Sequence, residues 1–199
     1  MSALTELYGE IAHCQLCELA KYRTKVVPGE GAEDAGIVFI GEAPGWHEDQ
    51  QGRPFVGPAG LYLDELLASI NLKREQVYIA NVIKCRPHGN RDPLPTEIHS
   101  CRKWLERQIE IIRPKMIVTL GRYSMAMFFS GKSISKIHGT AQKRDNVIYY
   151  AMYHPAAALH QQSLRRAIEE DMLKIPLLLA EVEGIAEDKP QPQQLTMFE

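Results

Sequence analysis

The sequence predicts an α/β fold in which helices flank a mostly parallel central sheet. Two short segments, Ile37–Ile40 and Met116–Leu120, are almost wholly apolar, and each is followed by a glycine. Strands buried on both faces have this composition. The intervening segments have the 3.6-residue periodicity of helices. Because parallel strands need a long crossover between them, this alternation favours a parallel α/β sandwich.

The chain has 199 residues, 45% of them hydrophobic, and a formal net charge of -2. This length suits one hydrophobic core, so we expect a single domain and a monomer. No apolar run approaches the roughly 20 residues that cross a bilayer. The segment 1–12 contains Glu6 and Glu10 where a signal peptide would be basic. We therefore expect a cytoplasmic protein without a membrane anchor.

The elements follow one another regularly along the chain. A short amphipathic helix precedes an extended, glycine-containing segment, and strands then alternate with helices. The predicted strands are Ile37–Ile40, Val77–Ala80, Met116–Leu120 and Val147–Met152. The predicted helices are Ala3–Ala12, Gly60–Ile70, Thr96–Ile112 with Thr96 as its cap, Tyr123–Phe129 and a long helix from about Ser163 to Val182. A short polar hairpin is expected at Ser133–Thr140.

The last segment, Gly184–Glu199, differs in composition from the rest of the chain. It is polar and contains two prolines. Such a composition does not supply enough apolar surface to fold by itself, so we expect a disordered tail. The predicted organisation is therefore a domain over residues 1–183 followed by a tail over residues 184–199.

All four cysteines fit one metal-ligand arrangement: Cys14-x2-Cys17 near the N-terminus, then Cys85 and Cys101 on either side of a loop. A two-residue gap lets two thiolates converge on one centre, and two distant ligands would tie the N-terminal arm to the body of the fold. Four soft ligands suit either zinc or an iron-sulfur cluster. The alternatives are four buried apolar cysteines or two disulfides, and a reduced intracellular chain has little use for disulfides.

The segments after the predicted strands are rich in chemistry. Gly41-Glu42-Ala43-Pro44-Gly45 follows the first strand, Asn81 the second, and His154-Pro155 the fourth. Ligands of parallel sheets bind at the carboxyl ends of the strands, so these residues should meet in one crevice. The glycine-bounded loop matches neither a dinucleotide fingerprint nor a P-loop. Each feature alone also has a simpler interpretation: the loop as a structural turn and Asn81 as a satisfied buried amide. Basic clusters such as Lys21, Arg23 and Lys25 have the simpler interpretation of solvated surface.

Several motifs together resemble a known family. They are the Cys-x2-Cys pair, GEAPGWHED, QGRPFVGPAG, YIANVIKCRP, NRDPLPTE, a further cysteine and YHPAAALH, in this order between Cys14 and His160. This arrangement is similar to the family 4 uracil-DNA glycosylases, the iron-sulfur branch of their superfamily. The resemblance implies an open four-stranded parallel sheet flanked by helices, and a [4Fe-4S] cluster on Cys14, Cys17, Cys85 and Cys101. It also implies excision of uracil from single- or double-stranded DNA during base excision repair.

The resemblance implies a role for each crevice residue. Phe55 would stack on the flipped uracil, and Asn81 would read its edge with an amide that both donates and accepts. Glu48 would lie near carbon 5 and exclude thymine, while His154 would stabilise the negative charge on a uracil oxygen. Backbone groups of Gly41 and Ala43 would complete the uracil site.

The chain differs from the best-known branch of the superfamily at the residue that would activate the attacking water. The third position of the first motif, an aspartate there, is Ala43 here. Glu42 and Glu48 are the candidate substitutes, and Glu42 could instead brace the loop. The basic residues expected to approach DNA phosphates are Arg86, Arg91, Lys136 and His138.

A binding protein that captures uracil-containing DNA without turnover is the alternative function. In the related branch that reacts covalently with the sugar, the first motif has a glutamine and the loop before the last cysteine reads K-R-R-I-H. Here the corresponding positions are Ala43 and Arg86-Pro87-His88-Gly89-Asn90-Arg91. These differences favour a glycosylase. An electron carrier is disfavoured because it would need no such crevice.

The end of the tail resembles the short peptide with which bacterial repair enzymes bind the sliding clamp. The residues concerned are Gln194, Leu195, Met197 and Phe198. Apolar anchors on an otherwise polar tail gain free energy only when a partner groove receives them. A frayed apolar end is the alternative interpretation. The sequence therefore predicts a sliding clamp as a partner through this segment.

Overall fold

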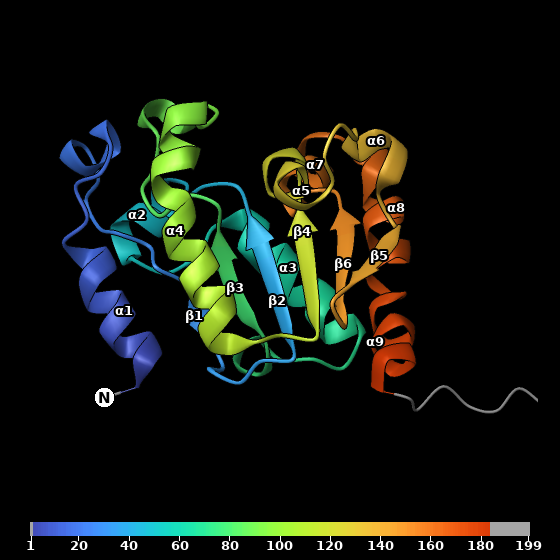
Figure 1. The fold of residues 1–199 in the computed structure, drawn as a ribbon. Helices are drawn as coiled ribbons and strands as arrows, with labels where there is room; N and C mark the ends of the chain where they lie inside the picture. The colour runs from blue at the N-terminus through green and yellow to red at the C-terminus, as the bar shows by residue number, and fades with distance from the viewer. Residues whose placement is uncertain (1, 184–199) are drawn as a thin grey trace, which may run out of the picture.

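The computed structural model describes residues 2–183. These residues contain one six-stranded sheet, whose strands lie side by side in the order β1-β3-β2-β4-β6-β5 (Figure 1). The strands are β1 (Glu30–Gly31), β2 (Ile37–Gly41), β3 (Tyr78–Asn81), β4 (Met116–Leu120), β5 (Ala141–Arg144) and β6 (Val147–Met152). The central strands β3, β2, β4 and β6 are parallel, whereas β1 and β5 pair antiparallel at the two edges.

Helices connect the strands and cover both faces of the sheet. The α-helices are α1 (Ala3–Ala12), α2 (Trp46–Gln51), α3 (Pro58–Ser69), α4 (Pro95–Ile112), α5 (Arg122–Phe128), α6 (Ile134–Ile137), α7 (Pro155–His160), α8 (Ser163–Met172) and α9 (Ile175–Glu183). Short 3-10 turns are η1 (Glu18–Lys21), η2 (Arg74–Gln76) and η3 (His88–Asn90).

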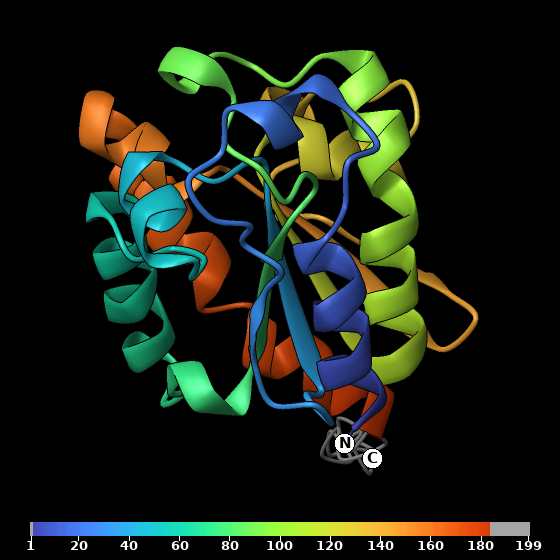
Figure 2. The ribbon, with the colours of Figure 1, turned by 90° about the vertical axis from the view of Figure 1, so that its left-hand side faces the viewer.

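The sheet separates two apolar cores. Figure 2 shows the sheet nearly edge-on, with α3 on one side and α1 and α4 on the other. Phe39 and Val118 point into the core under α3, α8 and α9, whereas Val38 and Ile117 point into the core under α1 and α4. Alternate residues of a strand face opposite sides, so two buried faces require continuously apolar strands. This requirement explains the composition of β2 and β4.

The predicted α/β class is confirmed, but the predicted four-stranded sheet is wrong in number. The four predicted strands form its parallel centre, and β1 and β5 extend the edges. All four residues of β5 are exposed and polar or small, so this strand has no apolar pattern to reveal it. Asp145 and Asn146 both have positive φ, as a two-residue hairpin turn requires. The hairpin is therefore β5-β6, and the segment 133–140 contains α6 instead.

Two predicted helix features are also corrected. Thr96 does not cap α4: Leu94 is the N-cap, and the Glu97 carboxylate accepts a hydrogen bond from the Leu94 N–H at 2.8 Å. The single helix predicted from about Ser163 to Val182 is divided into α8 and α9. Pro176 has no N–H to donate to the preceding turn and its ring crowds that turn, so it begins a new helix well but continues one poorly.

The predicted tail and its clamp-binding residues lie outside the described residues. Among the helices of residues 2–183, none is both long and apolar enough to cross a membrane.

Candidate active site

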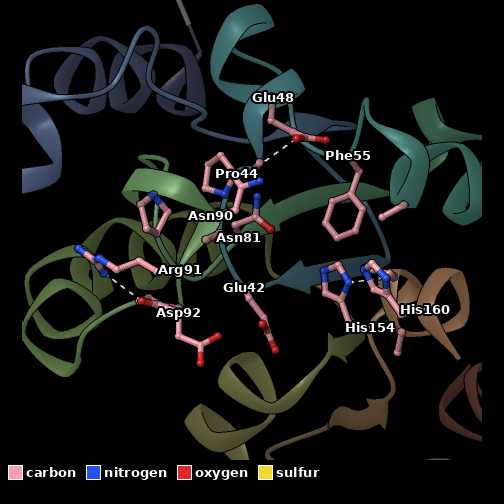
Figure 3. A pocket seen from close by; sticks show the side chains of 17 residues that line it. Glu42, Pro44, Glu48, Phe55, Asn81, Asn90, Arg91, Asp92, His154 and His160 are labelled. Carbon is pink, nitrogen blue, oxygen red and sulfur yellow. Dashed lines mark hydrogen bonds between the residues drawn. The ribbon is translucent and has the colours of Figure 1, made fainter.

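A pocket of about 440 Å³ opens at the carboxyl ends of the parallel strands. The loop after β2 contributes Glu42 to Gly45, the end of β3 contributes Asn81, and the start of α7 contributes His154. Figure 3 shows these side chains and Phe55 around one cavity. The prediction that the strand-end residues meet in a single crevice is confirmed.

Asn81 is placed by the pairing of β2 with β3. The two strands are parallel, and Gly41 lies opposite Asn81 in the register. A side chain at Gly41 would have no room, because a Cβ there would approach Asn81 Oδ1 to 2.4 Å and the Phe55 ring to 2.6 Å. Asn81 is 2% exposed, and within residues 2–183 its buried Oδ1 has no hydrogen-bond partner. An unpaired buried amide oxygen is costly and indicates a ligand with a matching donor.

Phe55 and His154 face each other across the pocket. Their rings are stacked, with centroids 5.4 Å apart and an interplanar angle of 23°. Phe55 has a φ of 50°, which is unusual for a bulky residue. Arg74 holds its carbonyl with a hydrogen bond of 3.0 Å, and Gly60 leaves space for that carbonyl. The aromatic ring is therefore fixed by its backbone as well as by packing.

His154 is the N-cap of α7, and its Nδ1 accepts a hydrogen bond from the Ala156 N–H at 3.1 Å. Burial lowers the pKa of His154 to about 4, although the nearby Glu48 carboxylate acts in the opposite direction. A neutral imidazole whose Nδ1 accepts must carry its proton on Nε2. His154 is therefore a neutral donor at physiological pH.

Glu48 lines the pocket, but its carboxylate is engaged with the backbone. Oε2 accepts from the Gly45 N–H at 3.1 Å, and Oε1 accepts from the N–H groups of Val56 and Gly57, both at 2.9 Å. One carboxylate thus joins the loop after β2 to the segment that follows Phe55. This geometry makes Glu48 a brace of the pocket wall.

Glu42 lies beside the first turn of α5. Its Oε1 is 3.4 Å from the Tyr123 backbone N–H, which donates to it. Burial raises the pKa of Glu42 above the usual value, and the N–H groups of Arg122 and Tyr123 oppose the shift. Arg122 also forms an ion pair with Asp92, whose side chain lines the same pocket. A carboxylate with a raised pKa is a stronger base than an ordinary glutamate.

The four cysteines are brought together as predicted, because all of them line one small pocket next to α4. Three of the sulfurs accept hydrogen bonds. Trp104 Nε1–H donates to Cys14 Sγ at 3.2 Å, an Arg23 N–H to Cys85 Sγ at 3.1 Å, and the Lys84 N–H to Cys101 Sγ at 3.3 Å. No disulfide links any of the four cysteines in the structure.

The donor set suits an anionic metal centre. N–H groups directed at sulfur stabilise thiolates, and cationic side chains balance their charge. Burial is the main cause that raises the pKa of Cys101 to about 12, so without a metal this sulfur would stay protonated. Within residues 2–183 no three His, Cys, Asp or Glu side chains form a compact group around a single ion. The support for a metal therefore comes from the four sulfurs and from the N–H groups directed at three of them.

Of the four residues predicted to contact DNA phosphates, only Arg91 lines the pocket. Arg91 lines the pocket and forms an ion pair of 2.6 Å with Glu97, and Arg86 donates to Asn90 at 2.6 Å in the same loop. Lys136 and His138 are separate from the pocket lining. His138 Nδ1 lies 2.7 Å from Oδ2 of the buried Asp171.

Three residues that shape the site were not predicted from the sequence: Arg74, Asp92 and Lys84. Arg74 and Asp92 act through long-range contacts that no local pattern reveals. The sequence does contain a signal for Lys84, because it is the one charged residue in the apolar stretch between Asn81 and Cys85.

Comparison with known proteins agrees with this geometry. Residues 28–174 match the family model of the Uracil DNA glycosylase superfamily. The chain is 48% identical over 185 residues to a type-4 uracil-DNA glycosylase of Sulfurisphaera tokodaii, covering 88% of this chain and 84% of that protein. It is 45% identical over 177 residues to a type-4 enzyme of Thermotoga maritima, covering 86% of this chain and 92% of that protein.

A type-5 uracil-DNA glycosylase of Thermus thermophilus is more distant. It is 34% identical over 119 residues, which cover 52% of this chain and 54% of that protein. The similarity to the type-4 proteins is higher and extends over most of both chains. The chain therefore belongs to the type-4 uracil-DNA glycosylase family of the uracil-DNA glycosylase superfamily.

Proposed function

We infer that this protein is a DNA repair enzyme that flips uracil out of DNA and hydrolyses its N-glycosidic bond, leaving an abasic site. The observation that carries this inference is the pocket itself. A buried amide without a partner, a neutral imidazole and a fixed aromatic ring converge there at the end of a parallel sheet. These are the groups that a flipped pyrimidine requires.

Asn81 supplies the selectivity for uracil over cytosine. Uracil presents a donor at N3 and an acceptor at O4, whereas cytosine presents an acceptor and a donor at the same positions. The Asn81 Oδ1 accepts from N3–H, and its NH₂ donates to O4. Cytosine would leave the buried amide facing groups of the same kind, and the resulting unpaired polar groups are costly. Phe55 stacks on the ring and holds this edge against Asn81.

His154 stabilises the departing uracil. As the glycosidic bond breaks, negative charge collects on the base, and the Nε2–H of His154 donates to the oxygen that carries it. A neutral donor avoids the cost of burying an imidazolium before the reaction starts. One donor to a developing anion typically contributes about 3 to 4 kcal/mol to the transition state.

Glu42 positions the attacking water. Ala43 leaves the preceding loop without a carboxylate, and Glu48 is occupied by three backbone N–H groups. Asp92 is paired with Arg122. Glu42 is the pocket carboxylate whose raised pKa suits a general base. The geometry of Glu48 likewise supports a bracing role for it, by which it sets the wall near carbon 5 of the base.

The four cysteines hold a [4Fe-4S] cluster. Their shared pocket and the N–H groups directed at three sulfurs support this assignment. The cluster would supply a covalent link between the N-terminal arm and the loop after β3, which stabilises the fold because metal binding is coupled to folding. Cys85 and Cys101 enclose the loop that carries Arg91 to the pocket.

We expect His154→Ala and Asn81→Ala each to lower the single-turnover rate of uracil excision about 100-fold or more, because each removes a contact to the reacting base. Affinity for DNA should change little, since phosphate contacts dominate it. The measurement is alkali-induced cleavage of a uracil-containing oligonucleotide. His99→Ala, an exposed histidine outside the pocket, is the matched control. Near-normal rates in either pocket variant would refute these roles. A shifted protein band on a denaturing gel, without cleavage, would indicate capture instead of turnover.

The rate should depend on pH through Glu42. A base acts only when deprotonated, and burial raises the Glu42 pKa above the usual 4.5. The rate should therefore fall as the pH drops through a value above 4.5, before His154 begins to protonate near pH 4. Glu42→Gln keeps the shape but removes the base, so it should lower the plateau about 100-fold and abolish this fall. A Glu42→Gln profile identical to the wild type would assign the water to other groups.

Cys85→Ser should lose iron and visible absorption together, because three thiolates hold a cubane cluster poorly. Iron content per chain is the direct measurement. Ser100→Ala changes a residue of the same pocket that offers no sulfur, so it should keep full iron content. A colourless, zinc-loaded and active wild-type protein would rule out the cluster.

The tail binds a sliding clamp through Gln194, Leu195, Met197 and Phe198. Tethering raises the local concentration of an enzyme at newly made DNA without altering its chemistry. Deletion of residues 194–199 should abolish binding to a bacterial clamp in a calorimetric titration and leave excision of a short oligonucleotide unchanged. Equal clamp binding by the full-length and shortened chains would contradict this role.

A further inference from the structure

Lys84 is a fully buried charged residue that the proposed reaction does not use. It is 1% exposed and lies between the pocket residue Asn81 and the cysteine Cys85. Its Nζ donates to the backbone carbonyl of Asn81 at 2.9 Å and to Gln108 Oε1 at 2.7 Å. No carboxylate within residues 2–183 forms an ion pair with it. A buried ammonium without a counter-charge is strongly unfavourable, so its place needs an explanation.

Lys84 also lies against the cysteine pocket, which it lines together with Cys85 and Cys101. The backbone N–H of Lys84 also donates to Cys101 Sγ at 3.3 Å. Lys84 therefore contacts the sulfur ligands with its main chain and the uracil pocket with its side chain.

Gln108 of α4 anchors the other side of the ammonium. It is fully buried, and its Nε2 donates to the Tyr78 hydroxyl and to the Pro28 carbonyl, both at 2.8 Å. The Tyr78 hydroxyl in turn lies 2.7 Å from the Tyr8 hydroxyl of α1. A continuous hydrogen-bonded chain thus runs from α1 through the core to the end of β3. Gln108 is held by the Pro28 carbonyl and the Tyr78 hydroxyl without Tyr8, so the part of the chain from Tyr78 to Asn81 can hold one fixed arrangement.

The end of this chain is the peptide group that follows Asn81. The Lys84 ammonium fixes the Asn81 carbonyl, and the next two N–H groups bond to the carbonyls of Gly41 and Glu42. Rotation of this peptide plane would redirect the Asn81 side chain. A recognition amide must be held within about 0.5 Å to discriminate between bases, and a buried charged donor restricts that motion strongly.

We propose that Lys84 is a positioning residue for base recognition, which orients Asn81 by holding its carbonyl and is itself held by Gln108 and the cysteine sulfurs. This inference rests on the proposed function. It also links the cysteine pocket to the geometry of the uracil pocket, because the Lys84 backbone N–H donates to Cys101 Sγ. The Lys84 side chain does not touch the base.

The test compares Lys84→Met, which keeps length and apolar stem, with the wild type. The single-turnover excision rate should fall about 10-fold or more, because a small misplacement of a recognition group is enough for such a loss. Inhibition by free uracil should weaken by a similar factor, while affinity for uracil-free DNA should not change. A role in folding alone would lower thermal stability without altering uracil inhibition of the folded protein.

Two further variants make the result decisive. Tyr8→Phe removes a hydroxyl at the far end of the same hydrogen-bonded chain and should keep wild-type excision and uracil inhibition. Gln108→Leu leaves Lys84 and all four cysteines in place, so it should keep its iron and still weaken uracil inhibition, even if Lys84→Met does not fold.

The proposal is overturned if folded Lys84→Met, or folded and iron-loaded Gln108→Leu, retains wild-type uracil inhibition. It is also overturned if Tyr8→Phe shows an equal loss of excision and of uracil inhibition. A wild-type protein that does not excise uracil would instead refute the proposed function. The two failures are therefore distinguishable.

Discussion

The parallel register of β2 and β3 is the constraint on which the pocket depends. It sets Gly41 opposite Asn81, and the absence of a side chain at Gly41 lets the Asn81 amide and the Phe55 ring approach the same point. Parallel pairing also sends the loops after β2, β3 and β6 to one edge of the sheet, so residues more than 100 positions apart share a cavity. A residue larger than glycine at position 41 would separate these groups.

The pocket walls are fixed mainly by hydrogen bonds to the backbone. Glu48 joins two loops by accepting from three N–H groups, and Arg74 holds the Phe55 carbonyl. His154 accepts the first free N–H of α7, a contact that also determines which ring nitrogen carries the proton. These residues keep the site in shape before a base enters, which lowers the cost of binding. Asn81 Oδ1 differs from these groups because it has no hydrogen-bond partner within residues 2–183 and can accept one from a ligand.

The buried polar groups beneath the pocket connect it to the N-terminal arm. The cysteines, Lys84 and Gln108 lie against one face of the sheet, and each polar group there satisfies another. Removing one partner from such a network leaves an uncompensated group in the core, and that cost exceeds the value of the bond itself. The geometry of the site and the stability of the arm are therefore linked through common contacts.

The sequence by itself determined the α/β class, the four central strands and the residues at their carboxyl ends that line the crevice. Strands buried on both faces must be apolar, and functional residues must follow their carboxyl ends, so local patterns at Ile37–Ile40 and His154 were sufficient. Only the tertiary structure decided the rest. The polar edge strand β5 has no apolar pattern and is set by its hairpin turn with β6. The break before α9 follows from Pro176, a local signal that the prediction of a single long helix overlooked. The roles of Glu48, Arg74 and Lys84 depend on partners distant in sequence or packed around them, because hydrogen bonds and burial are set by the folded chain.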